Sequence, residues 1–312
     1  MSDINNPKSF GKVAVLMGGT SAERGISLLS GAAVLKSLLD SGVDACGIDV
    51  GQNIFVELQE KAIDRVFIML HGRNGEDGKM QAAMELIGMP YTGSGVLASA
   101  LAMDKVRCKQ LWRALGLNTP NFVVLTENTD WQAVINKLGT SFVKPVKEGS
   151  SIGIGKASSV EELKQAYENA RQYDNDVIAE QWIDGPEYTV AILGDLTLPV
   201  IELKTKHEFY DYDAKYEAQD TEYICPCDLN ATKKDEIQSL SKTAFDVLGC
   251  YGWGRVDLMQ DKAGEFWLLD LNTIPGMTDH SLVPMAAKHT GFDFDALVLS
   301  ILSSSNLDRE RV

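Results

Sequence analysis

The chain has 312 residues, 45% of them hydrophobic and 23% charged, which is ordinary for a soluble globular protein of two or three domains. Its 29 Lys and Arg against 44 Asp and Glu give a formal net charge of −15. We therefore expect neither nucleic acid nor an anionic membrane as a partner, because both are bound through clustered cations. A small anionic ligand remains compatible with this charge, since its site needs only a few local cations.

The first third of the chain alternates strand-like and helix-like segments. Val13–Met17 and Val66–Leu70 are continuous apolar runs, typical of strands buried on both faces. Each is followed by a loop that contains glycine, at 18–25 and 71–78. This alternation predicts a parallel sheet, with any site beyond the carboxyl ends of its strands. The helix between the two runs should bury one face, formed by Leu28, Ala32, Leu35 and Leu39.

After about residue 104 the pattern changes to runs of strands beside runs of helices, which indicates an α+β arrangement. Ser159 and Glu162 are spaced as the capping box of a helix over 160–172. A turn at Asp184-Gly185-Pro186 marks a domain border. Strands are predicted over 122–125, 141–144, 177–180, 188–193 and 198–203, and a further helix over 232–248.

The segment 253–272 predicts a hairpin around a turn at 261–264. If residue 260 pairs with 265, then 255 faces 270 and 257 faces 268. Two carboxylates and an amide oxygen beside an arginine would suit Mg²⁺ and phosphate. The alternative is a solvated outer face with an Arg–Asp ion pair. In this register one face carries Arg255, Asp257, Asp270 and Asn272, and the other carries Val256, Leu258, Leu269 and Leu271.

Three loops are candidate binding segments. Lys144 ends a predicted strand and is followed by a loop rich in Gly and Ser, which offers N–H groups to phosphate but does not match GxxxxGK[ST]. The loop His71–Gly78 holds three glycines, and Phe209–Tyr216 is aromatic and suited to a lid. The alternatives are a flexible hairpin loop, a structural histidine, and aromatics that plug a core edge.

The five cysteines are odd in number and lack a CxxC pair, so we expect reduced thiols rather than disulfides or a zinc site. Residues 1–11 lack the apolar core of a signal peptide, and no run approaches the ~18 apolar residues of a membrane span. We therefore expect a cytoplasmic protein.

Taken together, these segments resemble the D-alanine–D-alanine ligase family of ATP-grasp enzymes, from about Lys12 to about Leu302. Each motif is modest, but their order and spacing together are highly specific. The motifs are Gly18–Arg24, His71–Gly78, Glu148–Ser151, Glu180–Trp182, Glu187, Phe209–Tyr216, Gly254–Asp257, Asn272–Thr278 and His280–Leu282.

The resemblance implies an ATP-grasp fold, with a parallel α/β domain at 1–103 and two domains at 104–186 and 187–312 that clamp ATP. It implies that ATP phosphorylates the carboxylate of one D-alanine and that the amine of a second D-alanine attacks the acyl phosphate. The product would be D-alanyl-D-alanine, for peptidoglycan precursor synthesis. It also implies Mg²⁺ or Mn²⁺, as two ions, and a homodimer.

The resemblance further assigns roles to single residues. The catalytic set is Glu23, Ser150 and Tyr216, hydrogen-bonded around the first D-alanine, with Arg255 and the Gly276 N–H as the oxyanion hole. The other D-alanine contacts are His71, Ser281 and Leu282. The ATP contacts are Lys105, Lys144, Ser151, Glu180, Gln181, Trp182, Ile183, Glu187, Phe209 and Lys215. The metal ligands are Asp257, Asp270 and Asn272.

Two positions depart from the family pattern. Asp270 stands where a metal-bridging glutamate is usual, and the side chain is one methylene, or ~1.5 Å, shorter. Magnesium is still expected there, because three oxygen ligands remain. Gly25 stands where a bulkier, often acidic residue is common, next to the loop that holds Glu23.

Two other functions compete with this prediction. One is an ATP-grasp ligase for a different amino acid or hydroxy acid. Ligases that make D-alanyl-D-lactate generally lack the tyrosine-bearing loop at 209–216, so we expect D-alanine as the second substrate. The other is a nucleotide- or amino-acid-binding module without catalysis, which Asp270 would favour and the complete set of lysines, Arg255, Asp257 and Asn272 opposes.

Overall fold

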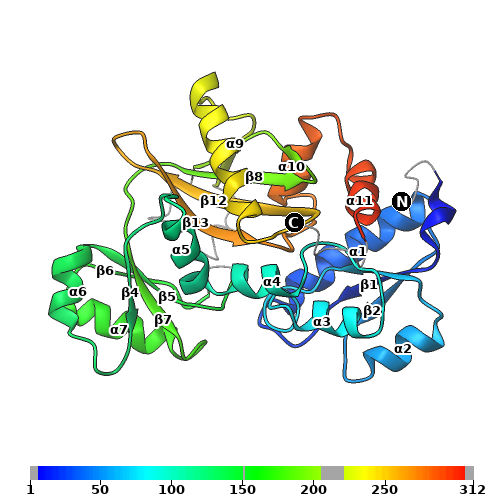
Figure 1. Cartoon of the computed structure of the whole chain (residues 1–312), viewed down its shortest axis with the longest axis horizontal. Helices are drawn as coiled ribbons and strands as arrows, with labels where there is room; N and C mark the ends of the chain where they lie inside the picture. The colour runs from blue at the N-terminus through cyan, green and yellow to red at the C-terminus, as the bar shows by residue number, and fades with distance from the viewer. Residues whose placement is uncertain (1–5, 150–151, 205–220, 306–312) are drawn as a thin grey trace.

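Three β-sheets, each with its own helices, make up the architecture of the computed structural model, which describes residues 6–149, 152–204 and 221–305 (Figure 1). In Figure 1 the N-terminal sheet lies at the right, the middle sheet at the lower left, and the large sheet above and between them. Helices α4 (Val96–Met103) and α5 (Lys105–Ala114) run across the centre from the first to the second. The predicted mixture of α/β and α+β parts is confirmed.

The N-terminal sheet is parallel, in the order β2-β1-β3, as predicted. All five residues of β1 are buried, which confirms a strand covered on both faces. Its elements are the 3-10 helix η1 (Pro7–Phe10), strands β1 (Val13–Met17), β2 (Ala45–Asp49) and β3 (Arg65–Ile68), and helices α1 (Arg24–Asp40), α2 (Ile54–Glu60) and α3 (Lys79–Leu86).

The predicted buried face of α1 is half correct, because Leu28 and Leu35 are partly buried against the core. Ala32 and Leu39 are exposed, and the helix packs on β1 through smaller residues. A Cβ on Gly31 would lie 2.5 Å from the Cβ of Met17, so the helix approaches the strand more closely than leucines would allow. The Ser27 hydroxyl donates to the Met69 carbonyl at 2.6 Å, so this buried hydroxyl has a hydrogen-bond partner. The buried face consists of Ser27, Ser30, Gly31, Val34, Ser37 and Leu38.

The middle sheet is antiparallel, in the order β4-β7-β5-β6. Ser159 caps α7 by accepting from the Glu162 N–H at 3.2 Å, while the Glu162 carboxylate accepts from Ser158 rather than from Ser159. Its elements are β4 (Phe122–Leu125), α6 (Trp131–Leu138), β5 (Ser141–Pro145), β6 (Gly155–Ala157), α7 (Val160–Ala170) and β7 (Val177–Gln181).

The large sheet has six strands, in the order β11-β10-β8-β12-β13 with β9 beside β8. Helix α9 covers one of its faces (Figure 1). Its elements are β8 (Glu187–Leu193), β9 (Leu196–Thr197), β10 (Ile201–Lys204), β11 (Glu222–Ile224), α9 (Ala231–Asp246), β12 (Trp253–Gln260), β13 (Phe266–Asn272), α10 (Leu282–Lys288) and α11 (Phe294–Ser303).

The predicted register of the β12–β13 hairpin is wrong. Arg255 pairs with Asn272 and Asp257 with Asp270, after which the register shifts so that Leu258 pairs with Leu268. The turn is also one residue longer, because the Asp261 N–H reaches the Glu265 carbonyl. The shift is a β-bulge, which places two residues of one strand against one of the other.

The bulge changes one residue and keeps the polar face. Leu269, predicted to face the core, lines a cleft instead, and fully buried Leu268 takes its place. The four polar residues Arg255, Asp257, Asp270 and Asn272 do share one face and line that same cleft.

The C-terminal helix returns to the N-terminal sheet. Helix α11 packs against α1, and one core cluster runs from Phe10 to Leu302. The Ser37 hydroxyl donates to Asp295 at 2.6 Å across this contact. All five cysteines are free thiols, as predicted, and no described helix is long and apolar enough to cross a bilayer.

Candidate active site

A cleft of about 1600 Å³ lies where the three sheets meet. Every predicted site residue that the structure describes lines it. These are Glu23, His71, Lys105, Lys144, Glu180, Gln181, Trp182, Ile183, Glu187, Arg255, Asp257, Asp270, Asn272, Gly276, Ser281 and Leu282. The predictions for Ser150, Ser151, Phe209, Lys215 and Tyr216 lie outside the described residues.

The loops after β1 and β3 meet at one side of the cleft. Ser21 donates to the His71 carbonyl at 2.7 Å, which ties the two loops together. Glu23, at the start of α1, is 7% exposed. Gly72 has φ +68, and a Cβ there would lie 2.7 Å from a Glu23 carboxylate oxygen, so this close approach requires glycine.

His71 and Glu76 of the second loop bind the backbone of the same residue, Ile274. The Ile274 carbonyl accepts from His71, and the Ile274 N–H donates to Glu76. Burial lowers the pKa of His71 to about 4, with Arg255 adding to the effect. Burial and the Glu23 carboxylate raise the pKa of Glu76 to about 8. At neutral pH His71 is therefore uncharged and Glu76 largely protonated.

His71 also has a nitrogen available to a ligand. Its Nε2 atom is buried and has no hydrogen-bond partner among the described residues. A buried polar atom of this kind is costly unless something in the cleft binds it. His71 thus fits a substrate contact better than a purely structural role.

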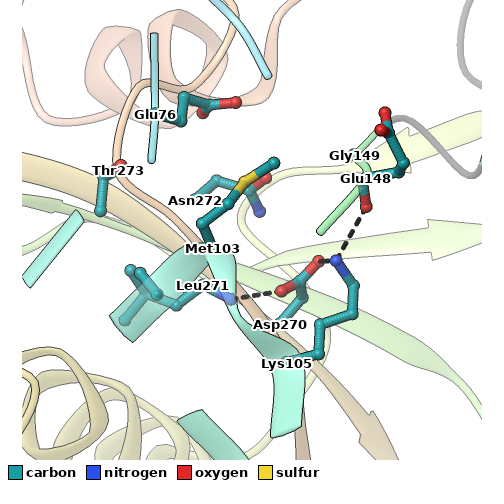
Figure 2. Close-up of a pocket in the computed structure, with 10 residues that line it drawn as sticks. Glu76, Met103, Lys105, Glu148, Gly149, Asp270, Leu271, Asn272 and Thr273 are labelled. Carbon is teal, nitrogen blue, oxygen red and sulfur yellow. Dashed lines mark hydrogen bonds and ion pairs between the residues drawn. The ribbon is translucent and has the colours of Figure 1, made fainter. Parts of the chain in front are cut away.

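Two predicted lysines face the cleft from different elements. Lys105, the first residue of α5, donates to the Glu148 carbonyl at 2.8 Å and lies 3.5 Å from an Asp270 oxygen (Figure 2). Lys144 on β5 donates to Glu180 at 2.7 Å. Lys105 and Asp270 line a side pocket of about 20 Å³, room for roughly one water. Figure 2 shows Glu76 on the opposite side from Lys105 and Asp270.

The polar face of the hairpin is held together by Asp257. Arg255 donates to both of its oxygens at 2.8 Å, Asn272 donates through its Nδ2 at 3.0 Å, and Thr189 donates at 2.7 Å. Asp270 pairs with Asp257 across the strands. Arg255 and Asp257 are each about four-fifths buried, so this fork is more than a surface ion pair.

The donor set on this face fits a hard divalent cation. Two carboxylates and an amide are adjacent on one face, which is the oxygen chemistry that Mg²⁺ prefers. No group of three or more His, Cys, Asp or Glu is gathered as at a metal centre in the described part of the chain. An ion here would therefore need phosphate or water for most of its ligands, and it would have to displace Arg255 or Asn272 from Asp257.

The opposite end of the cleft is formed by the end of β7. Trp182 stacks on Phe142, with ring centroids 5.1 Å apart and planes 14° apart, and the Lys156 ammonium lies 3.5 Å from the Trp182 ring centroid. Gln181 accepts from Asn121 at 3.0 Å. A flat aromatic wall beside strand backbone is suited to a planar ligand such as a purine base.

The loop before α10 completes the cleft. Ser281 precedes α10, and its hydroxyl accepts from the Thr278 N–H at 2.8 Å. The Met277 N–H donates to Ser30 of α1 at 3.1 Å. A Cβ on Gly276 would lie 3.0 Å from the Ser281 hydroxyl, so a larger residue would crowd that side chain.

Glu76, Leu269 and Lys109 are among the residues at or behind the cleft that the sequence predictions missed. Glu76 lies within the His71–Gly78 motif and could have been singled out as its buried acid. Leu269 was assigned to the core because a bulge leaves no mark in an alternating pattern. Lys109 follows Lys105 by four residues, so both lie on one helix face, and this spacing was the available signal.

Comparison with known proteins identifies the family. The family described as D-ala D-ala ligase C-terminus matches residues 111–303, and that described as D-ala D-ala ligase N-terminus matches residues 49–94. The chain is 58% identical over 301 residues to the D-alanine–D-alanine ligase of Ectopseudomonas mendocina (strain ymp), covering 96% of each chain.

Solved structures agree with this match. A crystal structure of D-alanine–D-alanine ligase from Bacillus anthracis has a TM-score of 0.86 at 32% identity, and a second one, complexed with ATP, has 0.84 at 30%; both cover 96% of this chain and 98% of theirs. The VanG D-Ala:D-Ser ligase from Enterococcus faecalis has a TM-score of 0.78 at 31% identity, over 94% of this chain and 98% of that one. With the predicted ATP-grasp fold thereby confirmed, the chain belongs to the D-alanine–D-alanine ligase family.

Proposed function

We propose that the protein joins two molecules of D-alanine into D-alanyl-D-alanine at the expense of ATP, for peptidoglycan precursor synthesis. The protein is an ATP-dependent carboxylate–amine ligase that releases ADP and phosphate. The observation that carries this proposal is the single cleft, lined by every described residue that the family resemblance assigned. Membership of the ligase family over nearly the whole chain supports it.

The first D-alanine would lie where the loops after β1 and β3 meet. The buried Glu23 carboxylate would hold its ammonium group, and the free Nε2 of neutral His71 would accept a further hydrogen bond. Its carboxylate would then face Arg255, whose charge offsets the oxyanion that develops as the acyl phosphate forms and is attacked. Ser281 and the Leu282 N–H would hold the carboxylate of the second D-alanine, with the Gly276 N–H beside the oxyanion.

ATP would occupy the side of the cleft between the middle and large sheets. The base would lie along Gln181, Trp182 and Ile183, with the carboxylate of Glu187 at the ribose. Lys105 and Lys144 would contact the phosphates. Phosphoryl transfer depends mostly on position and charge neutralisation, which explains why several cations point into one cleft.

Asp257, Asp270 and Asn272 would hold Mg²⁺ or Mn²⁺, as two ions. A divalent ion there would supply charge neutralisation for the phosphates. We further propose domains at 1–103, 104–186 and 187–312, a homodimer, and a cytoplasmic location. For the segments outside the described residues, Ser150 and Tyr216 would complete the set around Glu23, and Ser151, Phe209 and Lys215 would contact ATP.

The test is D-alanine-dependent release of phosphate from ATP in the presence of magnesium, with the product identified by mass. Wild-type protein should form the dipeptide, and Arg255→Met should lose most of the rate. Absence of D-alanine-dependent phosphate release would contradict this proposal and favour a binding module without catalysis. Parallel reactions with excess D-lactate or D-serine decide the second substrate, and a predominant ester or mixed dipeptide would contradict D-alanine.

A further inference from the structure

Lys109 is a fully buried cation that the proposed reaction does not use. It lies on α5, one helical turn after Lys105, and its side chain is 0% exposed. Helix α5 carries Lys105 into the cleft, whereas Lys109 points behind the cleft wall and does not line it. Burial of a lysine is expensive and is rarely found without compensating partners.

The partners of Lys109 come from both sheets that border the nucleotide side of the cleft. Its ammonium lies 2.5 Å from Glu180 of β7, donates to the Thr119 hydroxyl at 2.8 Å and lies 3.4 Å from the Leu268 carbonyl of β13. Three oxygens thus surround the three N–H groups of one ammonium. Lys109 ties α5 to the middle sheet and to the large sheet at one point.

Glu180 connects Lys109 to Lys144, which lines the cleft. One of its carboxylate oxygens binds Lys109 and the other accepts from Lys144 at 2.7 Å. Burial acts to raise the pKa of Glu180, but the two neighbouring ammonium groups lower it overall, so the carboxylate stays ionised. Both oxygens are engaged by lysines, which indicates that the Glu180 side chain serves the lysines more than a base in the cleft.

The charges of the three groups add up to one positive charge at the cleft wall. If Lys109 were absent, Glu180 and Lys144 would form a neutral pair, and Lys144 would be drawn toward the carboxylate and away from an anionic ligand. With Lys109 present, one of the two Glu180 oxygens already binds the Lys109 ammonium. Lys144 then keeps net positive charge toward the cleft.

We infer that Lys109 is a positioning residue of the nucleotide site, which acts through Glu180 to keep the charge and position of Lys144 for the phosphates of ATP. This inference rests on the proposed use of ATP. Lys109 itself does not touch the nucleotide. Its effect must therefore depend on the phosphates of the ligand and not on the base.

The test compares ATP with adenosine, which shares the base and ribose but carries no phosphate. Titration calorimetry should show that Lys109→Met lowers the affinity for ATP by about tenfold or more and the affinity for adenosine by less than about threefold. Arg107→Met, on the exposed face of the same helix, is the matched control and should change neither. Thermal melting of each variant separates loss of fold from loss of the site.

A double variant checks the route through Glu180. Lys109→Met with Glu180→Gln removes one charge of each sign, which restores the single positive charge, so its ATP-to-adenosine affinity ratio should return to within about threefold of wild type. This ratio also decides the matter should Lys109→Met alone not fold.

Three results are distinguishable from one another. The positioning role would be overturned if Lys109→Met lost affinity for ATP and for adenosine equally. It would also be overturned if the ATP-to-adenosine affinity ratio of the double variant stayed tenfold below wild type. A phosphate-dependent loss that the double variant reverses would support it. Failure of the wild-type protein to bind ATP would instead overturn the proposed function.

Discussion

The backbone of Ile274 connects the loop that follows β3 to the loop that carries Gly276. His71 and Glu76 bind its carbonyl and its N–H, and Ser30 binds the Met277 N–H three residues later. Each of the first two hydrogen bonds favours the charged form of its side chain, and burial shifts the pKa of both groups the other way. The loop that carries the proposed oxyanion hole is therefore held by two buried titratable side chains from the loop after β3.

The raised pKa of Glu76 makes stability depend on pH. Because the folded pKa is about 8 and the ordinary value is 4.5, the unfolded chain releases a proton between these values while the folded chain keeps it. Stability therefore falls as pH rises from about 4.5 to about 8. Glu76→Gln mimics the protonated acid, so in metal-free buffer it should exceed wild type in free energy of unfolding by about 1 kcal/mol or more at pH 8.

That difference should vanish near pH 4.5, as measured by urea unfolding at both pH values. Glu60→Gln on the exposed surface of α2 controls for the loss of one carboxylate. The same gain at both pH values, or none at pH 8, would contradict a buried protonated Glu76.

The short side chain of Asp270 should limit metal affinity. In the structure it lies 3.5 Å from Lys105 and accepts from the Leu271 N–H, so it is held close to its own strand. Asp270→Glu adds ~1.5 Å of reach toward a cation shared with Asp257. Titration of Mn²⁺ in the presence of ADP, followed by electron spin resonance, should show affinity rising about three- to tenfold.

The control for this change is Asp195→Glu, in the exposed turn after β8. It should leave Mn²⁺ binding as in wild type. Weaker binding by Asp270→Glu would mean that the site is built around the shorter side chain.

At the scale of single elements, a prediction from the sequence was correct where the element kept a regular hydrophobic pattern. Strand β1 was predicted correctly because its five apolar residues are followed by two glycines, and a run of that length suits a buried strand and is too short for a helix. Helix α1 was also predicted, but only half of its packed face was, because serine and glycine can line a helix face where the backbones come close, and hydropathy does not register this. The hairpin register failed at the bulge by Leu269, although alternation still placed the polar face correctly.

Gly25 offers a test of the start of α1. It is the second residue of the helix, and a Cβ there would meet nothing within 4 Å. Gly25→Ala should therefore stabilise the protein by roughly 0.5–1 kcal/mol, because alanine loses less backbone freedom on folding. Urea unfolding measures the change.

Gly42, just after the same helix, is a matched control. A Cβ there also meets nothing within 4 Å, but φ is +81, which strains any side chain. Gly42→Ala should destabilise. A shift of the same sign in both variants would show that space rather than backbone conformation governs these positions.

At the scale of the whole molecule, the excess of acidic residues extends into the cleft. Lys105, Lys144 and Arg255 each have an acidic partner in the structure, and the described lining of the cleft holds four Lys and Arg against ten Asp and Glu, so the cleft is acidic before a ligand enters. The net charge of −15 therefore repels ATP at long range while local lysines attract it at short range. Lys109 binds one of these acids, Glu180, from behind the cleft wall, which leaves positive charge on Lys144 for an anionic ligand.

The N-terminal sheet and the C-terminal helix form one core. Ile301 of α11 is 0% exposed within the cluster that also holds β1, whereas Leu163 of α7 belongs to a separate cluster in the middle sheet. Ile301→Ala should cost about 2–5 kcal/mol through the cavity it leaves. Because the cavity lies in the shared core, hydrogen exchange should lose protection in the amides of β1 and α1, far away in sequence.

Leu163→Ala, which is also fully buried, should speed exchange in the middle sheet and leave β1 protected. The pair of variants thus maps which parts of the molecule open together. If Ile301→Ala increased exchange in α10 and α11 alone, the C-terminal helix would be an independent cover rather than part of the N-terminal core. In that case the loop from Ile274 to Ser281 would be anchored to the first sheet by its own contacts, with no help from the helices that follow it.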